Sequence, residues 1–310
     1  MSFFSSKKGT VIVVVALLMT IFISFLALVI DVGTLYLERI RLVNTLDAAA
    51  LAGVQELPID PQLAKNTAVS YANQNGLVSS NLTVEITDDK QQINLSGTNQ
   101  VGMNFAVIFG INQVEVVASS KARIGKVTAI AGAVPFGVVN QEFVYGDKYY
   151  LKYGAGGNGV ADGRNGNFGA LALGGNGANN YEDNIKYGYG SQLEVGQEVT
   201  TEPGNMSGPT ARGVEYRLDQ CDSVPACTFD SVKSDCPQLV MVPVIDSLGN
   251  GRSTSTIVGF AAFFLEGLTN GNGNGNNSYV EGRFISWMTQ SGEMGSEGEN
   301  FNLRTIKLID

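Results

Sequence analysis

The chain has 310 residues, 38 of them glycine and none histidine, with a formal net charge of −9. This acidity argues against nucleic acid or an anionic membrane face as a partner. Without histidine, the most common general base and a common zinc ligand are both missing, so neither nucleophilic catalysis nor a zinc site is expected.

The first element is an uncharged apolar segment from Val11 to Ile30, in which fifteen of twenty residues are Val, Ile, Leu or Phe. A helix of that length spans about 30 Å, the thickness of the hydrocarbon core of a bilayer. Its insertion is favourable by roughly 5 to 9 kcal/mol. A cleaved signal would have a shorter apolar stretch and a small-x-small cleavage site, and a buried core helix would have a polar face. We therefore predict a transmembrane helix over residues 10–30, anchored by apolar side chains that include Val11, Leu17, Phe22, Leu26 and Ile30.

The charges that flank this segment predict its orientation. Lys7 and Lys8 precede it, and the first residue after it is the acidic Asp31. The positive-inside rule then places residues 1–9 in the cytoplasm and the chain after Asp31 outside a cell membrane that it crosses once.

A helical pattern continues without a break from Asp31 to Gly53, with Leu42 and Leu46 in its apolar stripe, and Pro58 ends it. A second helix is predicted to begin with Asp60 as N-cap and to stop at Gly76.

Alternating apolar residues predict two strands, which contain Leu82–Ile86 and Ile93–Leu95 and join through a turn at residues 88–90. Residues 101–111 are predicted to form a short buried helix, and 114–124 a further strand. Residues 31–126 would then be a small α+β module that uses the long helix in its core.

Beyond residue 127 the composition becomes rich in glycine and asparagine, and no helix-length periodic segment is found. Apolar runs of β type lie at 143–153, 168–173, 239–245, 257–266, 279–287 and 303–309. Residues 127–310 are therefore predicted to be a mostly β exterior domain, a sandwich or a roll.

Three cysteines, Cys221, Cys227 and Cys236, are the only ones in the chain. Their spacing fits no zinc pattern, and in an exported domain we expect one disulfide and one remaining thiol. The sequence leaves open which two cysteines pair, and also whether all three stay reduced.

The segment DVGTLYLERIRLVNTLDAAALAG, directly after a transmembrane run, resembles the N-terminal domain of TadG-like proteins of the bacterial tight-adherence (Flp pilus) system. The residues that carry the resemblance are Asp31, Gly33, Arg39, Arg41, Asp47, Ala48, Ala49, Ala50, Leu51, Ala52 and Gly53. It implies a role in assembling, anchoring or capping a pilus, or in displaying an exterior domain. The implied partners are the lipid bilayer and other pilus-assembly or pseudopilin subunits.

Two features of related proteins do not carry over. Prepilins of this class have Glu at the fifth position after a cleaved glycine, and counting from Gly9 that position is Val14. Some relatives bind a metal through a D-x-S-x-S loop, but the best match begins at Asp246 and lacks both serines. We therefore expect neither that cleavage nor that metal site.

The small side chains from Ala48 to Gly53 allow another backbone to approach closely. Two partners are open: the protein's own sheet, which we favour, or a helix of a sister subunit.

Several sequences look like sites but have simpler interpretations. The glycines from Gly154 to Gly159 match G-x-G-x-x-G, but no helix pattern follows them, so they are read as a strand-connecting loop. Asp162, Asn165 and Asn167, with Asn158 nearby, are calcium-type ligands without an EF-hand order, and are read as turn residues. Glu182, Asp183, Glu194 and Glu198 are read as surface residues.

The sequence therefore predicts a non-catalytic, membrane-anchored protein of pilus assembly or surface display, with no cofactor and no metal. The alternative is a membrane-anchored adhesin or glycan-binding protein, whose ligand would stack on exposed tyrosines. The candidate tyrosines are Tyr149, Tyr150, Tyr153, Tyr181, Tyr187 and Tyr189. A third alternative is an exterior hydrolase that uses carboxylates.

Overall fold

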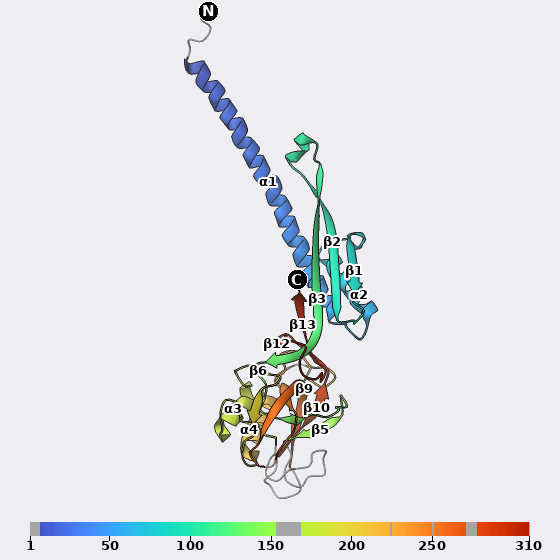
Figure 1. Cartoon of the computed structure of the whole chain (residues 1–310), viewed down its shortest axis with the longest axis vertical. Coiled ribbons are helices and arrows are strands. Elements are labelled where there is room, and N and C mark those ends of the chain that lie inside the picture. Colours follow the sequence, from blue (N-terminus) through green and yellow to red (C-terminus); the bar gives the residue numbers. More distant parts are fainter. Residues whose placement is uncertain (1–6, 153–168, 224, 250, 271–277, 310) are drawn as a thin grey trace, which may run out of the picture. The chain divides into compact units, whose positions relative to one another are not determined.

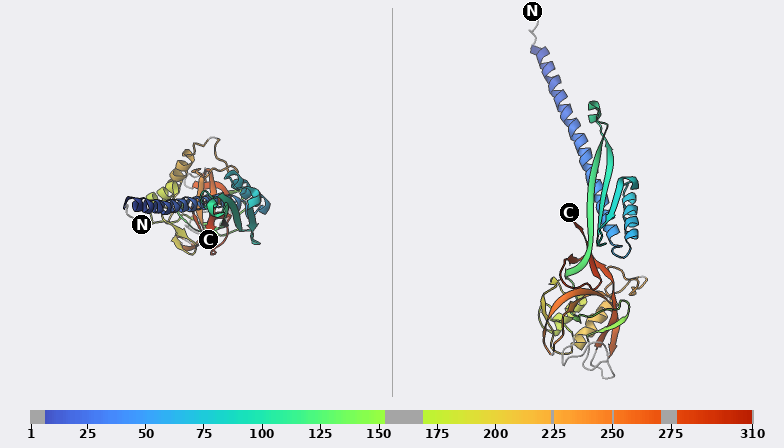
Figure 2. Two further views of the ribbon diagram at one scale, coloured as in Figure 1. Left: turned by 90° about the horizontal axis from the view of Figure 1, so that it is seen from above. Right: turned by 45° about the vertical axis from the view of Figure 1, so that its right-hand side comes forward.

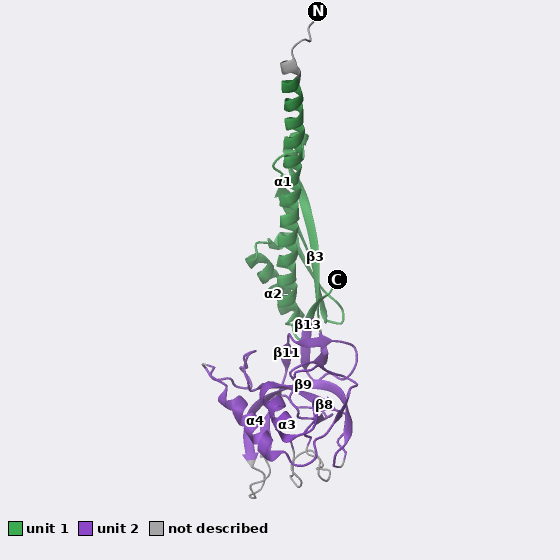
Figure 3. Cartoon of the chain, turned by 90° about the vertical axis from the view of Figure 1, so that its left-hand side faces the viewer, with its two compact units in different colours: residues 1–124, 307–310 green, residues 125–306 purple. Residues whose placement is uncertain are grey.

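The computed structural model describes residues 7–152, 169–223, 225–249, 251–270 and 278–309. The chain divides into two compact units, one of residues 1–124 with 307–310 and one of residues 125–306 (Figure 3). The first unit contains the predicted anchor and its module, and the second contains the glycine-rich region.

Helix α1 (Lys7–Val54) joins the apolar segment and the motif segment in one uninterrupted helix, as predicted. All side chains from Val11 to Ile30 are exposed except that of Ala27, which is half-buried. From Leu42 onward the helix buries one side, including Leu46, Ala49 and Ala50. The same helix therefore has an apolar part with no protein around it and a part packed into a core.

Helix α2 (Pro61–Gln74) begins and ends where its capping residues predict. Asp60 Oδ1 accepts hydrogen bonds from the backbone N–H groups of Gln62 at 3.0 Å and Leu63 at 2.8 Å, which satisfies two free donors of the first turn. Gly76 has a φ of 90°, a conformation that glycine adopts without strain. The buried residues recur every four positions and are all alanine, at 64, 68 and 72. This small-residue face lets α2 lie close to α1.

Two antiparallel hairpins complete the first unit: β1 (Leu82–Ile86) pairs with β2 (Gln92–Gly102), and β2 pairs with β3 (Gln113–Ile130). Figure 1 shows α1 running along the β2–β3 hairpin, and the right-hand view of Figure 2 shows α2 beside β1. A 3₁₀ turn, η1 (Ser79–Asn81), precedes β1. The two predicted strands and their turn are confirmed.

The prediction of a buried helix over residues 101–111 is wrong. β2 continues to Gly102, and the hairpin closes through a short 3₁₀ helix, η2 (Ala106–Phe109), none of whose residues is buried. An apolar run usually indicates burial, whereas these side chains lie at the tip of a hairpin.

The second unit is built on a six-stranded sheet in which β8 (Leu239–Ile245), β9 (Thr254–Asn270) and β10 (Ser278–Ile285) are antiparallel neighbours. Its other strands are β4 (Val138–Val139), β5 (Lys148–Leu151) and β7 (Glu198–Thr200). Short strands pair elsewhere in the unit: β6 (Leu193–Glu194) and β12 (Gly292–Met294) with the end of β3, and β11 (Trp287–Thr289) with the start of β13 (Leu303–Ile309). The predicted mostly β region is confirmed.

Strand β9 is buried on both faces. Ala261, Phe263 and Leu265 lie in one apolar cluster, and the alternate residues Phe260, Ala262 and Phe264 lie in a second one on the opposite face. A continuous apolar run is therefore the sequence signal of this central strand.

The second unit also contains two helices that the sequence did not predict, α3 (Ala178–Tyr187) and α4 (Ser207–Asp219), which pack side by side (Figure 1). A Cβ on Gly213 of α4 would lie 2.7 Å from the Cβ of Ile185, so the two helices approach closely there. Tyr181 and Ile185 are fully buried. Tertiary packing supports these helices, because their glycine- and asparagine-rich sequences favour helix only weakly.

Candidate functional site

The predicted anchor residues lie on the exposed apolar part of α1. Val11, Leu17, Phe22, Leu26 and Ile30 are all exposed, and no residue of the most apolar window of the helix is buried by the described protein. α1 is also the one described helix long and apolar enough to cross a membrane. A core helix of a soluble protein would bury such side chains, so this exposure fits a lipid contact.

Asp31, the first residue of the motif, is buried and caps the tip of the β2–β3 hairpin. Its Oδ1 accepts a hydrogen bond from the backbone N–H of Asn104 at 2.8 Å, and its Oδ2 accepts one from Ala106 at 2.7 Å. The N–H of Phe105 lies 3.1 and 3.3 Å from the two oxygens. These three amides lead into η2, where donors have no intrahelical acceptor, so one carboxylate satisfies all of them. Asp31 thus fixes the hairpin tip to α1 at the end of the apolar segment.

The charged residues of the motif lie farther along α1. Glu38 accepts a hydrogen bond from Asn99 Nδ2 at 2.6 Å and lies 3.6 Å from an exposed Arg41 guanidinium. Arg39 is exposed and Asp47 is half-buried. An exposed ion pair of this kind contributes well under 1 kcal/mol to folding. Stabilisation of the fold therefore does not explain the two arginines of the motif.

The small residues of the motif pack inside the same chain. A Cβ on Gly53 would lie 2.8 Å from the Ala64 carbonyl oxygen, 2.9 Å from Ala68 Cβ and 2.9 Å from Ile93 Cδ1. Ala49, Ala50 and Ala52 are also buried, while Ala48 and Leu51 are half-buried. α2 and β2 therefore fill the space that a sister helix would need. In contrast, nothing lies within 4 Å of a Cβ built on Gly33.

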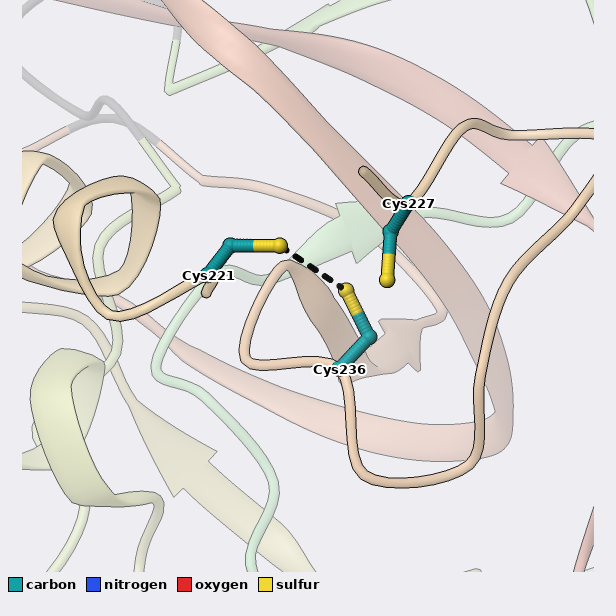
Figure 4. Close-up of side chains that lie close together, drawn as sticks. All are labelled: Cys221, Cys227 and Cys236. Carbon is teal, nitrogen blue, oxygen red and sulfur yellow. Dashed lines mark hydrogen bonds between the residues drawn. The ribbon is translucent and has the colours of Figure 1, made fainter. Parts of the chain in front are cut away.

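The three cysteines of the second unit converge (Figure 4). Their sulfur atoms all lie within 4.8 Å of one another, and Cys221 Sγ is 4.0 Å from Cys236 Sγ. Cys227 and Cys236 are buried, and all three are in the thiol form. Burial raises the pKa of Cys236 to about 12. Burial also raises the pKa of Cys227, but hydrogen bonds that include one from Cys236 outweigh that effect and bring it to about 7. The arrangement can form one disulfide, or it can present three sulfur ligands.

Two buried charged groups in the second unit were missed by the sequence. Lys152 Nζ donates to Ser207 Oγ at 3.2 Å, and burial lowers the pKa of this lysine to about 7. Glu182, predicted to be on the surface, is buried; it lies 2.6 Å from Arg212 and 2.5 Å from Lys186. The burial of Glu182 could not be predicted from the sequence around it, because its partner Arg212 comes from the other helix, α4.

The candidate tyrosines do not form one surface. Tyr181 is fully buried, Tyr149 and Tyr189 are half-buried, and Tyr150 and Tyr187 are exposed. Tyr187 packs edge-on against Tyr216 with ring centroids 5.5 Å apart. Tyr153, the glycines at 154–159 and the calcium-type residues Asn158, Asp162, Asn165 and Asn167 lie outside the described residues.

The comparison with known families concerns the N-terminal part of the first unit. Residues 9–56 match the family model described as "Putative Flp pilus-assembly TadE/G-like". Residues 9–56, called the Tad segment below, are therefore similar to that family. No curated protein and no solved structure matches the chain. The Tad match covers the apolar half of α1, Asp31 and the small residues to Gly53, and it confirms the resemblance predicted from them.

Proposed function

We propose that this chain is a membrane-anchored, non-catalytic component of a tight-adherence (Flp-type) pilus assembly system. The observation that carries the proposal is that the Tad match, residues 9–56, includes the exposed apolar part of α1, residues 11–30. The proposed topology is a single span, with a short cytoplasmic N-terminus and the chain after Asp31 outside. The proposed partners are the bilayer and other pilus-assembly or pseudopilin subunits.

The two ends of α1 support different parts of this proposal. The exposed apolar end needs a lipid environment to cover it. The other end is packed against α2 and β2, so it holds an exterior unit at a defined distance from the span. Because α1 is one continuous helix, it fixes the distance between the span and the folded residues that follow it. A protein that anchors or displays an assembly needs such a fixed distance.

The test is genetic and structural. In the native bacterium, removal of the chain should reduce the number of surface pili counted by electron microscopy, and the full chain should restore it. A chain in which a cleavable signal peptide replaces residues 1–30 should be secreted and fold but fail to restore pili. Unchanged pili after removal of the chain would refute the proposal.

The alternative of an adhesin has one observation in its favour, the exposed Tyr187 beside Tyr216 in the second unit. Aromatic side chains of this kind stack on sugar rings. Binding of the full chain in detergent to a glycan array, lost in a Tyr187→Ala variant while pilus number stays normal, would favour the adhesin.

A further inference from the structure

The tip of the β2–β3 hairpin exposes large apolar side chains. Ile108 and Phe109 of η2 are 80% and 85% exposed, and Val107 and Ile111 are exposed as well. No charged residue occurs from Gln91 to Val114, so the hairpin end itself contributes no charged side chain. Tips of soluble hairpins are normally polar, and a patch of this kind signals a partner.

The contacts of β2 with α1 show which way this tip points. A Cβ on Gly97 would lie 3.2 Å from Leu46 and 3.4 Å from Leu42, Asn99 donates to Glu38, and Asn104 donates to Asp31. As β2 advances toward its end, its contacts on α1 therefore move back from residue 46 to residue 31, by about 22 Å along the helix axis. The chain continues in the same direction into η2, toward the apolar segment.

Asp31 then fixes the height of the tip. Its carboxylate holds the amides of residues 104–106, and Ile30 beside it is the last residue of the apolar segment. Ile108 and Phe109 follow within three residues, a distance on the order of 6 Å. The interfacial layer of a bilayer is of similar depth, roughly 5 to 7 Å on each side.

We infer that the η2 tip, through Ile108 and Phe109, inserts into the outer interfacial layer of the membrane that α1 crosses. The occupant of this patch is lipid, because Asp31 holds the patch at the end of the apolar segment of α1. This second contact would stop the first unit from rotating freely about a single helix. The inference rests on the proposed function only in its membrane anchor.

The test places a tryptophan at the tip in the full chain, reconstituted in phosphatidylcholine nanodiscs. Trp287, the only tryptophan, is first changed to Phe, and Phe109→Trp is added. The matched control is Ile59→Trp, since Ile59 is also 85% exposed. It follows the end of α1 at Val54, about 35 Å beyond Asp31 along the axis.

Lipid brominated on the acyl chains should quench the tip tryptophan roughly twofold and leave the control unquenched, while aqueous iodide should quench the control several-fold more strongly than the tip. Equal iodide quenching at both positions, without quenching by brominated lipid, would overturn the inference.

Two further outcomes separate the alternatives. Protection of the tip that disappears in discs holding a single copy would mean that a second copy covers the patch, and would also overturn the inference. Alkaline carbonate extraction of native membranes tests the anchor itself. A chain that resists extraction while its tip stays in water would refute this inference alone, whereas a chain released by carbonate would refute the anchor as well.

Discussion

Asp31 has two structural roles. It marks the end of the apolar segment, and its two oxygens receive three consecutive backbone N–H groups from a hairpin tip 73 to 75 residues later in the chain. Hydrogen bonds to a charged acceptor are among the stronger ones in proteins. The aspartate at this place in the Tad segment therefore has a structural explanation.

Replacing Asp31 by Asn should loosen the tip without unfolding the unit. An amide keeps one acceptor oxygen but loses the charge, and loss of such a cap costs about 0.5 to 2 kcal/mol. Hydrogen exchange of the amides of residues 104–106 should become faster by roughly one order of magnitude. Asp47→Asn is the control, since this half-buried aspartate of α1 has no hydrogen-bond or ion-pair partner among the described residues. Similar exchange in both variants would contradict the capping role.

Lys152 should make the stability of the second unit depend on pH. Its pKa is about 7 in the folded protein and about 10.5 when unfolded, so between these values the unfolded chain holds one more proton. The free energy of unfolding should then rise with pH over that window by up to about 1.4 kcal/mol per unit. Lys152→Met removes this slope, so its advantage over the native chain should shrink from pH 7 to pH 9 in urea unfolding.

Lys148, the first residue of β5, is the control for that measurement. The Glu281 carboxylate raises its pKa above 10.5, so its contribution to stability is fully present below pH 10.5 and is lost only above it. The difference between Lys148→Met and the native chain should therefore stay constant from pH 7 to pH 9. A constant difference for Lys152→Met as well would contradict the burial of its ammonium group.

The cysteines should yield one disulfide in the exported protein, and we predict the pair Cys221–Cys236, whose sulfurs are 4.0 Å apart. A bridge that closes a loop of this size stabilises by about 3 kcal/mol. Mass spectrometry of unreduced peptides should find the bridge in the native chain and in Cys227→Ser, but not in Cys236→Ser. Three free thiols with a bound metal ion would contradict it.

At the scale of elements, Gly33 and Gly53 of α1 distinguish the effect of packing from that of helix propensity. Gly53→Ala should destabilise the first unit by about 1 to 3 kcal/mol, because the new Cβ meets α2 and β2 at under 3.0 Å. Gly33→Ala should instead be neutral or stabilise by up to about 1 kcal/mol, since nothing lies within 4 Å of it. Thermal unfolding of both variants in the same detergent checks this; a stabilising Gly53→Ala would mean that α2 is not seated there.

Local signals explain which elements could be predicted. The N-cap Asp60, the glycine at 76 and the alternation from Leu82 to Ile86 each act within a few residues, and the structure has helix α2 and strand β1 at those places. The bounds of β13, Leu303–Ile309, also agree with the predicted run.

What could not be predicted depends on contacts between distant residues. The turn at η2 exists because Asp31 caps it, and the buried Glu182 depends on Arg212, thirty residues away. Helices α3 and α4 have weak propensities and form through contact with each other. The same limit applies to the candidate site. The resemblance identifies Asp31 as a motif residue, but the sequence does not predict that Asp31 binds the tip of the β2–β3 hairpin.

At the scale of the whole molecule, orientation in the membrane is set by very few charges. Lys7 and Lys8 precede the apolar segment, and charges count in orientation only within about 15 to 20 residues of a span. Changing both to Glu should therefore lower the fraction of molecules whose compact units are accessible to protease added outside intact cells stripped of their wall. The same change in charge at Lys65 and Lys90, more than thirty residues beyond Ile30, should leave that fraction unaltered. If the Lys7→Glu/Lys8→Glu chain stayed fully accessible, the size of the translocated units, and not the flanking charge, would fix the topology.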